Sequence, residues 1–90
     1  MPLRRRADAG GGGLAAVRPP SVVRLTAVAL GPADRLRLAE LGLRPGAVVT
    51  VRRRMAGGAR LLGLGTSRIA VDPRIARALA VEDLGMSEGP

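Results

Sequence analysis

The chain has 90 residues, a net charge of +8, and no cysteine, histidine or aromatic residue. This length suits one small domain, and the missing residue types exclude disulfides, thiolate or imidazole metal sites and an aromatic platform for stacking bases. All fifteen basic residues are arginine, so the surface is predicted to attract nucleic acid, an anionic membrane or an acidic partner, unless it is simply solvated.

The chain is expected to begin and end in flexible segments. Residues 1–13 predict an Arg/Gly-rich tail, because four consecutive glycines do not recover the entropy lost on ordering. A short turn after this tail is expected to bury Leu14 and Val17 against the underside of the domain. The ordered domain is therefore predicted over residues 14–82, followed by a flexible C-terminal tail at 83–90.

A strand and then a helix open the domain. Residues 22–30 are rich in β-branched and apolar side chains and predict a strand. Gly31 and Pro32 introduce a short helix, with Asp34 near its N-terminus. Gly42 follows the last helical position, where a left-handed residue is favoured, so the helix is predicted to stop there.

The sequence RLAELGLRPG, residues 37–46, is the best-specified segment of the chain. Leu38 and Leu41 are three residues apart in the predicted helix and share one face, so both side chains are expected to be buried and to plug the end of the barrel core. Pro45 and Gly46 fit positions i+1 and i+2 of a type II turn that leads into the next strand. Together with Gly42, these residues form a structural motif without reactive groups.

The other side of the same helix is a candidate partner-contact surface. Arg35 and Arg37 lie off the face that carries Leu38, and Leu36 points away from it. These three side chains are expected to be exposed, and Leu36 is expected to contact a partner if the helix binds one.

The remaining elements are short apolar runs separated by Gly and Pro turns. They are a strand at 47–54, a hairpin of 60–64 with 68–71, a helical turn at 73–78 and a closing strand at 79–82. About five short strands with one or two small inserted helices predict a mainly β fold, a small barrel.

Three consecutive arginines end the strand at 47–54. Strict alternation places Arg52 and Arg54 on one face and Arg53 on the other. With Arg60 and Arg68 across the hairpin, they would form a basic patch that binds nucleic acid or protein. The alternative is a solvated barrel rim, and the sequence favours neither.

No pattern in the chain supports catalysis or a cofactor. The glycine-rich segments 10–13 and 63–67 lack the lysine and helix of a phosphate-binding loop. Ser21, Ser67 and Ser87 have no histidine to activate them, and the acids form no cluster suited to a metal ion. The protein is therefore predicted to be non-enzymatic, with no cofactor and no metal site. No apolar run approaches the roughly 18 residues of a membrane span, and a cytoplasmic location is expected.

The chain resembles the FeoA family, the small cytosolic proteins of bacterial ferrous iron uptake, most clearly in the segment RLAELGLRPG. The similarity spans residues 14–82, with Pro20 standing where the family usually has glycine. Outside the motif it rests on Leu14, Val17, Leu25, Val28, Val49, Val51, Arg68, Ile69, Ala70, Val71, Ala76, Leu79 and Val81.

The resemblance implies a five-stranded Src-homology-3-like barrel that acts in Fe(II) uptake by contacting the cytosolic part of the FeoB permease. It places the protein in the cytoplasm, at the inner face of the membrane through that partner. The barrel is also similar to the C-terminal domain of DtxR-type metal-dependent repressors. A nucleic-acid-binding barrel and a free-standing regulatory barrel stay open as alternatives, as does a homo-oligomer.

Overall fold

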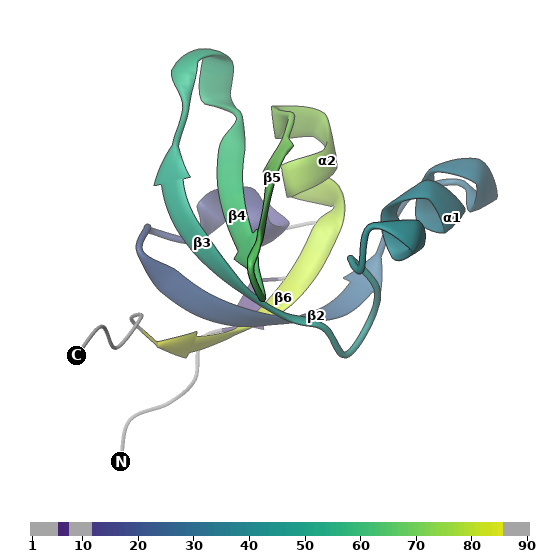
Figure 1. The fold of residues 1–90 in the computed structure, drawn as a ribbon, viewed down its shortest axis with the longest axis horizontal. Coiled ribbons are helices and arrows are strands. Elements are labelled where there is room, and N and C mark those ends of the chain that lie inside the picture. Colours follow the sequence, from purple (N-terminus) through teal and green to yellow (C-terminus); the bar gives the residue numbers. More distant parts are fainter. Residues whose placement is uncertain (1–5, 8–11, 86–90) are drawn as a thin grey trace.

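The structure is a computed structural model that describes residues 6–7 and 12–85. The described residues form one antiparallel sheet in the order β1-β6-β2-β3-β4-β5 (Figure 1). The strands are β1 Arg6–Ala7, β2 Ser21–Val28, β3 Val48–Arg54, β4 Arg60–Leu64, β5 Ser67–Val71 and β6 Leu79–Gly85. The helices are η2 Gly13–Ala16, α1 Pro32–Glu40, η3 Ala56–Gly58 and α2 Pro73–Ala78.

The five longer strands curl into a small barrel. Register shifts between Leu25 and Ala27 of β2, and between Val51 and Arg53 of β3, mark where the sheet bends. The predicted mainly β fold, a Src-homology-3-like barrel with one or two short inserted helices, is therefore confirmed, and the α-helices are two, α1 and α2.

The core lies inside this barrel. Its largest fully buried side chains are Leu14, Val23, Leu25, Leu43, Val49, Val51, Leu62, Leu79 and Val81. Leu14 and the neighbouring Val17 are both buried, as the sequence predicts for the turn at the start of the domain. Val49 and Val51 also share the inner face of β3, as alternation predicts.

The predicted tails lie largely outside the described residues, which leave out 1–5, 8–11 and 86–90. The domain limits therefore stay a prediction. Two differences fall within the described part: Arg6–Ala7 pairs with β6, and β6 continues to Gly85 rather than ending at residue 82. A two-residue strand carries no periodicity, so sequence patterning gives no signal for β1.

The end of α1 corrects one prediction. Leu43 donates its backbone N–H to the Leu38 carbonyl at 2.8 Å, and Gly42 donates to Ala39 at 2.9 Å, with Gly42 at φ +96°. This is the Schellman pattern, which turns the residue after the left-handed glycine back onto the helix. Leu43 is fully buried beside Leu38, whereas Leu41 is 51% exposed. The expectation that Leu41 plugs the barrel was wrong.

The turn after Leu43 is the predicted one. Gly46 has φ +95°, and Ala47 donates to the Arg44 carbonyl at 3.0 Å, as a type II turn with Pro45 at i+1 requires. Gly46 also donates to the Leu25 carbonyl at 2.7 Å. The turn is thereby fixed to β2, and it sets the register in which β3 begins.

Candidate docking surfaces

The helix α1 stands away from the barrel, and one of its nine residues, Leu38, is buried (Figure 1). Leu36 is 63% exposed and Leu41 is 51% exposed. Val48, at 45%, is the third large apolar side chain exposed in the described part of the chain. We call Arg35, Leu36, Arg37 and Leu41 the α1 surface. It comprises the three exposed partner-contact residues that the sequence predicts in this helix, together with Leu41 at the C-terminal end of the helix.

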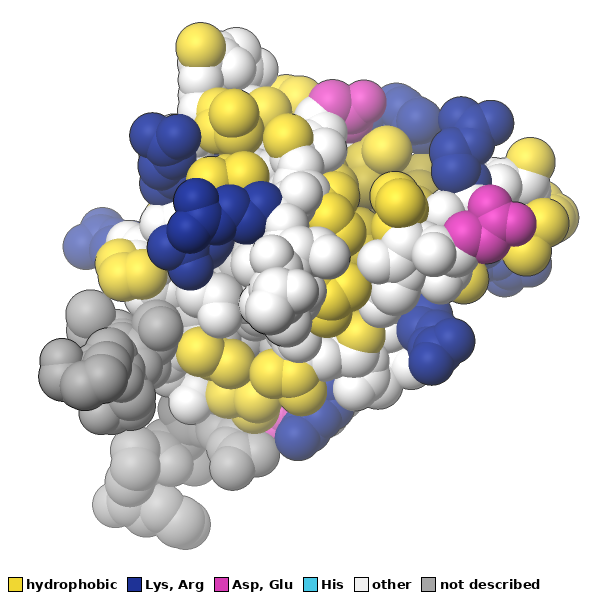
Figure 2. Space-filling model, viewed as in Figure 1, with side chains coloured by type: hydrophobic (Ala, Val, Ile, Leu, Met, Phe, Trp, Pro, Cys, Tyr) yellow, Lys and Arg dark blue, Asp and Glu magenta, His cyan; other side chains and the backbone are white. Residues whose placement is uncertain are grey.

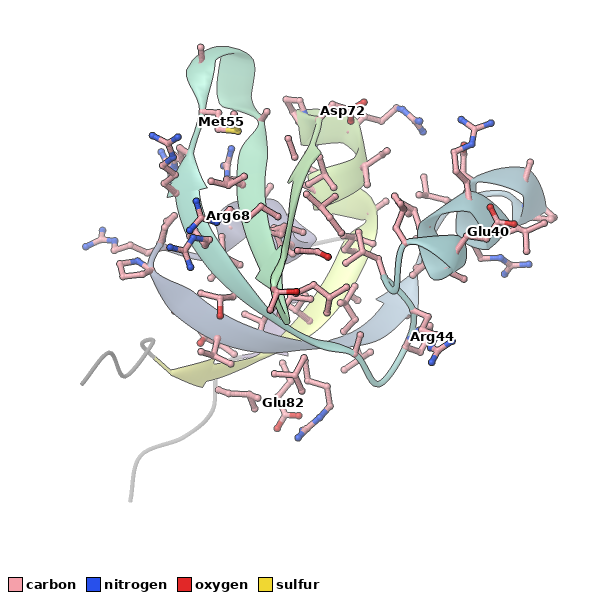
Figure 3. The ribbon with its side chains drawn as sticks, viewed as in Figure 1. Glu40, Arg44, Met55, Arg68, Asp72 and Glu82 are labelled. Carbon is pink, nitrogen blue, oxygen red and sulfur yellow. The ribbon has the colours of Figure 1, made fainter. Side chains whose placement is uncertain are left out.

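A hollow of about 380 Å³ lies between α1 and β2. Val28, Ala39 and Leu43 contribute to an apolar lining, and the cationic side chains of Arg35 and Arg44 line it too. Figure 3 shows Arg44 on the loop between α1 and β3, and Glu40 further out on the helix. The hollow therefore adjoins the α1 surface and combines apolar walls with positive charge.

The arginines of β3 are not distributed as strict alternation predicts. The register passes from Val51 opposite Leu62 to Arg53 opposite Leu61, so Arg52 is the extra residue of a bulge. Directly opposed residues share a face. Arg53 therefore lies with Leu61 on the outer face of the sheet, and Arg54, which is opposite Arg60, lies on the other face. The predicted pairing of Arg52 with Arg54 on one face was wrong.

Arg52 instead lies across β4 toward Arg68. A Cβ atom at Gly63 would stand 3.3 Å from Cδ of Arg52 and 3.7 Å from its Nη1, so the Arg52 side chain covers this glycine. Gly63 is opposite Arg68 of β5. Figure 3 shows Arg68 extending over β4 toward β3. We call Arg52, Arg53 and Arg68 the arginine surface.

No acidic side chain of the described residues neutralises the arginine surface. The ion pairs within the described part of the chain lie elsewhere: they join Arg24 to Glu82 at 2.9 Å and Arg74 to Asp34 at 3.8 Å. Figure 2 shows dark blue side chains over β3 and β4 with no magenta side chain among them. The three charges therefore face solvent without an internal counter-ion.

Arg60 differs from these arginines because it is buried, with 8% of its surface exposed. Its guanidinium donates to the carbonyl of Gly58 and, at 2.9 Å, to the carbonyl of Ala15, which ties β4 to η2. Its Nε has no hydrogen-bond partner among the described residues. Burial lowers the pKa of Arg60, and the nearby charge of Arg54 lowers that pKa further. Arg60 is thus a structural residue and not part of the basic patch that the sequence suggests.

The described residues, 6–7 and 12–85, lack both a metal-binding cluster and a membrane-spanning helix. No three acidic, histidine or cysteine side chains come together there as a metal site would require. No helix in that part of the chain is long and apolar enough to cross a bilayer.

The fold and its surfaces define a small Src-homology-3-like barrel with exposed faces of two kinds. The FeoA domain model matches residues 13–83, which is most of the chain. The protein therefore belongs to the FeoA family and is a small protein related to ferrous iron transport. No protein of curated function matches its sequence.

Solved structures agree with this family. The solution structure of the FeoA protein from Chlorobium tepidum is 28% identical, with a TM-score of 0.74 over 86% of this chain and 74% of that one. The crystal structure of an iron uptake regulatory protein, FeoA, is 25% identical, with a TM-score of 0.70 over 79% of this chain and 93% of that one. The metal-dependent transcriptional regulator MtsR shares the fold at 16% identity and a TM-score of 0.72, over 82% of this chain and 37% of its own length.

Proposed function

We propose that this protein is a non-enzymatic accessory of bacterial ferrous iron uptake that binds the cytosolic part of a FeoB-type permease through its α1 surface. In this role it works in the cytoplasm, beside the inner face of the membrane, and needs no cofactor. Family membership supports the link to iron transport. The contact with FeoB and the surface that makes it are the steps that the proposal adds.

The observation that carries the proposal is the pair of exposed leucines on a helix with one buried side chain. Leu36 and Leu41 both lie more than half exposed at the helix that projects furthest from the barrel. Covering apolar surface contributes about 25 cal/mol per Å², so a partner that buries both leucines gains binding energy from them. In a protein contact, a few residues near its centre carry most of the affinity.

The hollow beside α1 supports the same contact. An apolar side chain of the partner would fit between Val28 and Leu43, while Arg35 and Arg44 would meet acidic groups at its margin. Charge at the margin of such a contact mainly directs the approach of the partner and fixes its orientation. The expected binding region on the permease is therefore apolar at its centre and acidic around it.

Calorimetric titration of the cytosolic domain of the cognate permease tests this proposal. We expect a complex in the micromolar range, and no detectable binding at about 100 µM would overturn the proposal. Leu36→Glu is expected to weaken the complex at least about tenfold, since it places a charge in the contact. Val48→Glu is the matched control, because it makes the same change at an exposed apolar side chain outside the α1 surface. Circular dichroism of both variants would establish that each is folded.

A further inference from the structure

We propose that the arginine surface docks the protein on the anionic lipid headgroups of a membrane. Arg52, Arg53 and Arg68 lie on the outer face of the sheet, on β3 and β5 with β4 between them, and none has an acidic partner among the described residues. Guanidinium groups present several N–H donors in a planar fork that matches phosphate oxygens. A lipid phosphate would supply the counter-charge that the protein itself does not provide there.

Two features of the backbone assemble this surface. The bulge at Arg52 moves Arg53 to the outer face, where strict alternation would have kept these two residues apart. Gly63 of β4 has no side chain, so the Arg52 side chain lies over it, and Gly63 is opposite Arg68 of β5. An anionic surface that approaches this face is attracted by three positive charges at once.

The surface suits a membrane plane better than a nucleic acid. The chain has no aromatic residue on which bases could stack. Duplex-binding proteins typically neutralise about 6–10 phosphates, and three arginines over one stretch of sheet do not form such a track. The hairpin tip at residues 55–58 also carries no charge, so no acidic group there would repel an anionic membrane. A plane of headgroups, in contrast, is reached by all three arginines at once.

The location of the surface allows the two contacts to form together. Figure 1 places α1 on one side of the barrel and the arginine-bearing end of β3 on the other. A basic cluster of this size gives weak, reversible attraction, and stable membrane association takes a second signal. Contact of the α1 surface with a membrane protein would be that second signal, although the lipid contact itself does not depend on it.

Vesicle co-sedimentation with the full chain and no partner tests the inference. The vesicles contain phosphatidylcholine alone, or equal parts of phosphatidylcholine and phosphatidylglycerol. We expect binding to the anionic vesicles only, and loss of that binding between about 0.1 M and about 0.5 M salt as the charges are screened. Because each basic residue strengthens binding to an anionic leaflet about fivefold, Arg53→Gln combined with Arg68→Gln should weaken partitioning about 30-fold.

The control is Arg37→Gln combined with Arg77→Gln, which removes two exposed charges elsewhere on the described part of the molecule. It should weaken partitioning less than about fivefold. Equal losses in the two double variants would overturn the inference, since net charge alone would then explain the binding. Equal binding to neutral vesicles would overturn it too, as would tighter binding to a DNA duplex with the same arginine dependence. Loss of permease binding with vesicle binding retained would remove the proposed function and leave this inference standing.

Discussion

The α1 surface and the arginine surface differ in how the fold holds them. The α1 surface combines two exposed leucines with two arginines and projects on a helix that is anchored by Leu38 and by the buried Leu43 that follows it. The arginine surface is charged and lies on the rigid outer face of the sheet, where a bulge and a glycine set its geometry. One small barrel can therefore hold two unlike contact surfaces. Each surface has its own structural determinants, so substitutions can disrupt the two surfaces separately.

The largest effect is expected where α1 is anchored. Leu43→Ala should lower the free energy of unfolding by about 2–5 kcal/mol, because it leaves a cavity in the core. Leu41→Ala, two residues earlier, should lower the free energy of unfolding by less than about 1 kcal/mol, because that side chain is half exposed. Urea unfolding of both variants measures the difference. Equal costs would mean that Leu41 is part of the core after all.

The next effect separates the buried arginine from the exposed ones. Arg60→Ala removes the charged donor of the carbonyls of Ala15 and Gly58, and should destabilise the fold by about 1.5–3 kcal/mol. Arg53→Ala, on the outer face, should change stability by less than about 0.5 kcal/mol. Thermal unfolding measures both. A stability loss at Arg53 as large as that at Arg60 would show that the arginine surface has a structural role.

The smallest effect tests the geometry of the arginine surface with its charge unchanged. Gly63→Val places side-chain atoms where Arg52 now lies, so Arg52 should be pushed away from Arg68. Partitioning onto anionic vesicles should fall by up to about fivefold, the contribution of one arginine, while the protein stays folded. Ala70→Val is the control, since it creates the same valine side chain at an exposed position of β5. Identical partitioning of the two variants would mean that the position of Arg52 over β4 is unimportant.

The sequence predicts best where local chemistry dictates the backbone. Gly42, Pro45 and Gly46 each require a particular φ or turn position, and all three adopt it. Alternation likewise places Val49 and Val51 in the core, because β3 follows a regular pleat up to that point.

The errors arise where tertiary pairing overrides local pattern. Helical spacing groups Leu41 with Leu38, but the helix ends at Glu40, and the Schellman turn buries Leu43 instead. The glycine at position 42 is the signal that would have identified this, since the residue after such a cap packs back on the helix. The bulge at Arg52 has no comparable signal in β3 itself, because it depends on the register with β4. The sharing of one face by Arg52 and Arg53 was therefore missed, although the sequence did include Arg68 in the predicted basic patch.

Chemical-shift mapping by NMR tests the central claim most directly. Isotope-labelled protein is titrated with the unlabelled cytosolic domain of the cognate permease, and amide signals are followed residue by residue. We expect the changes to concentrate in α1, in Leu41 and in the residues of β2 and of the loop after α1 that line the hollow. Changes concentrated in β3, β4 and β5, with α1 unaffected, would contradict the assignment of the α1 surface as the docking site.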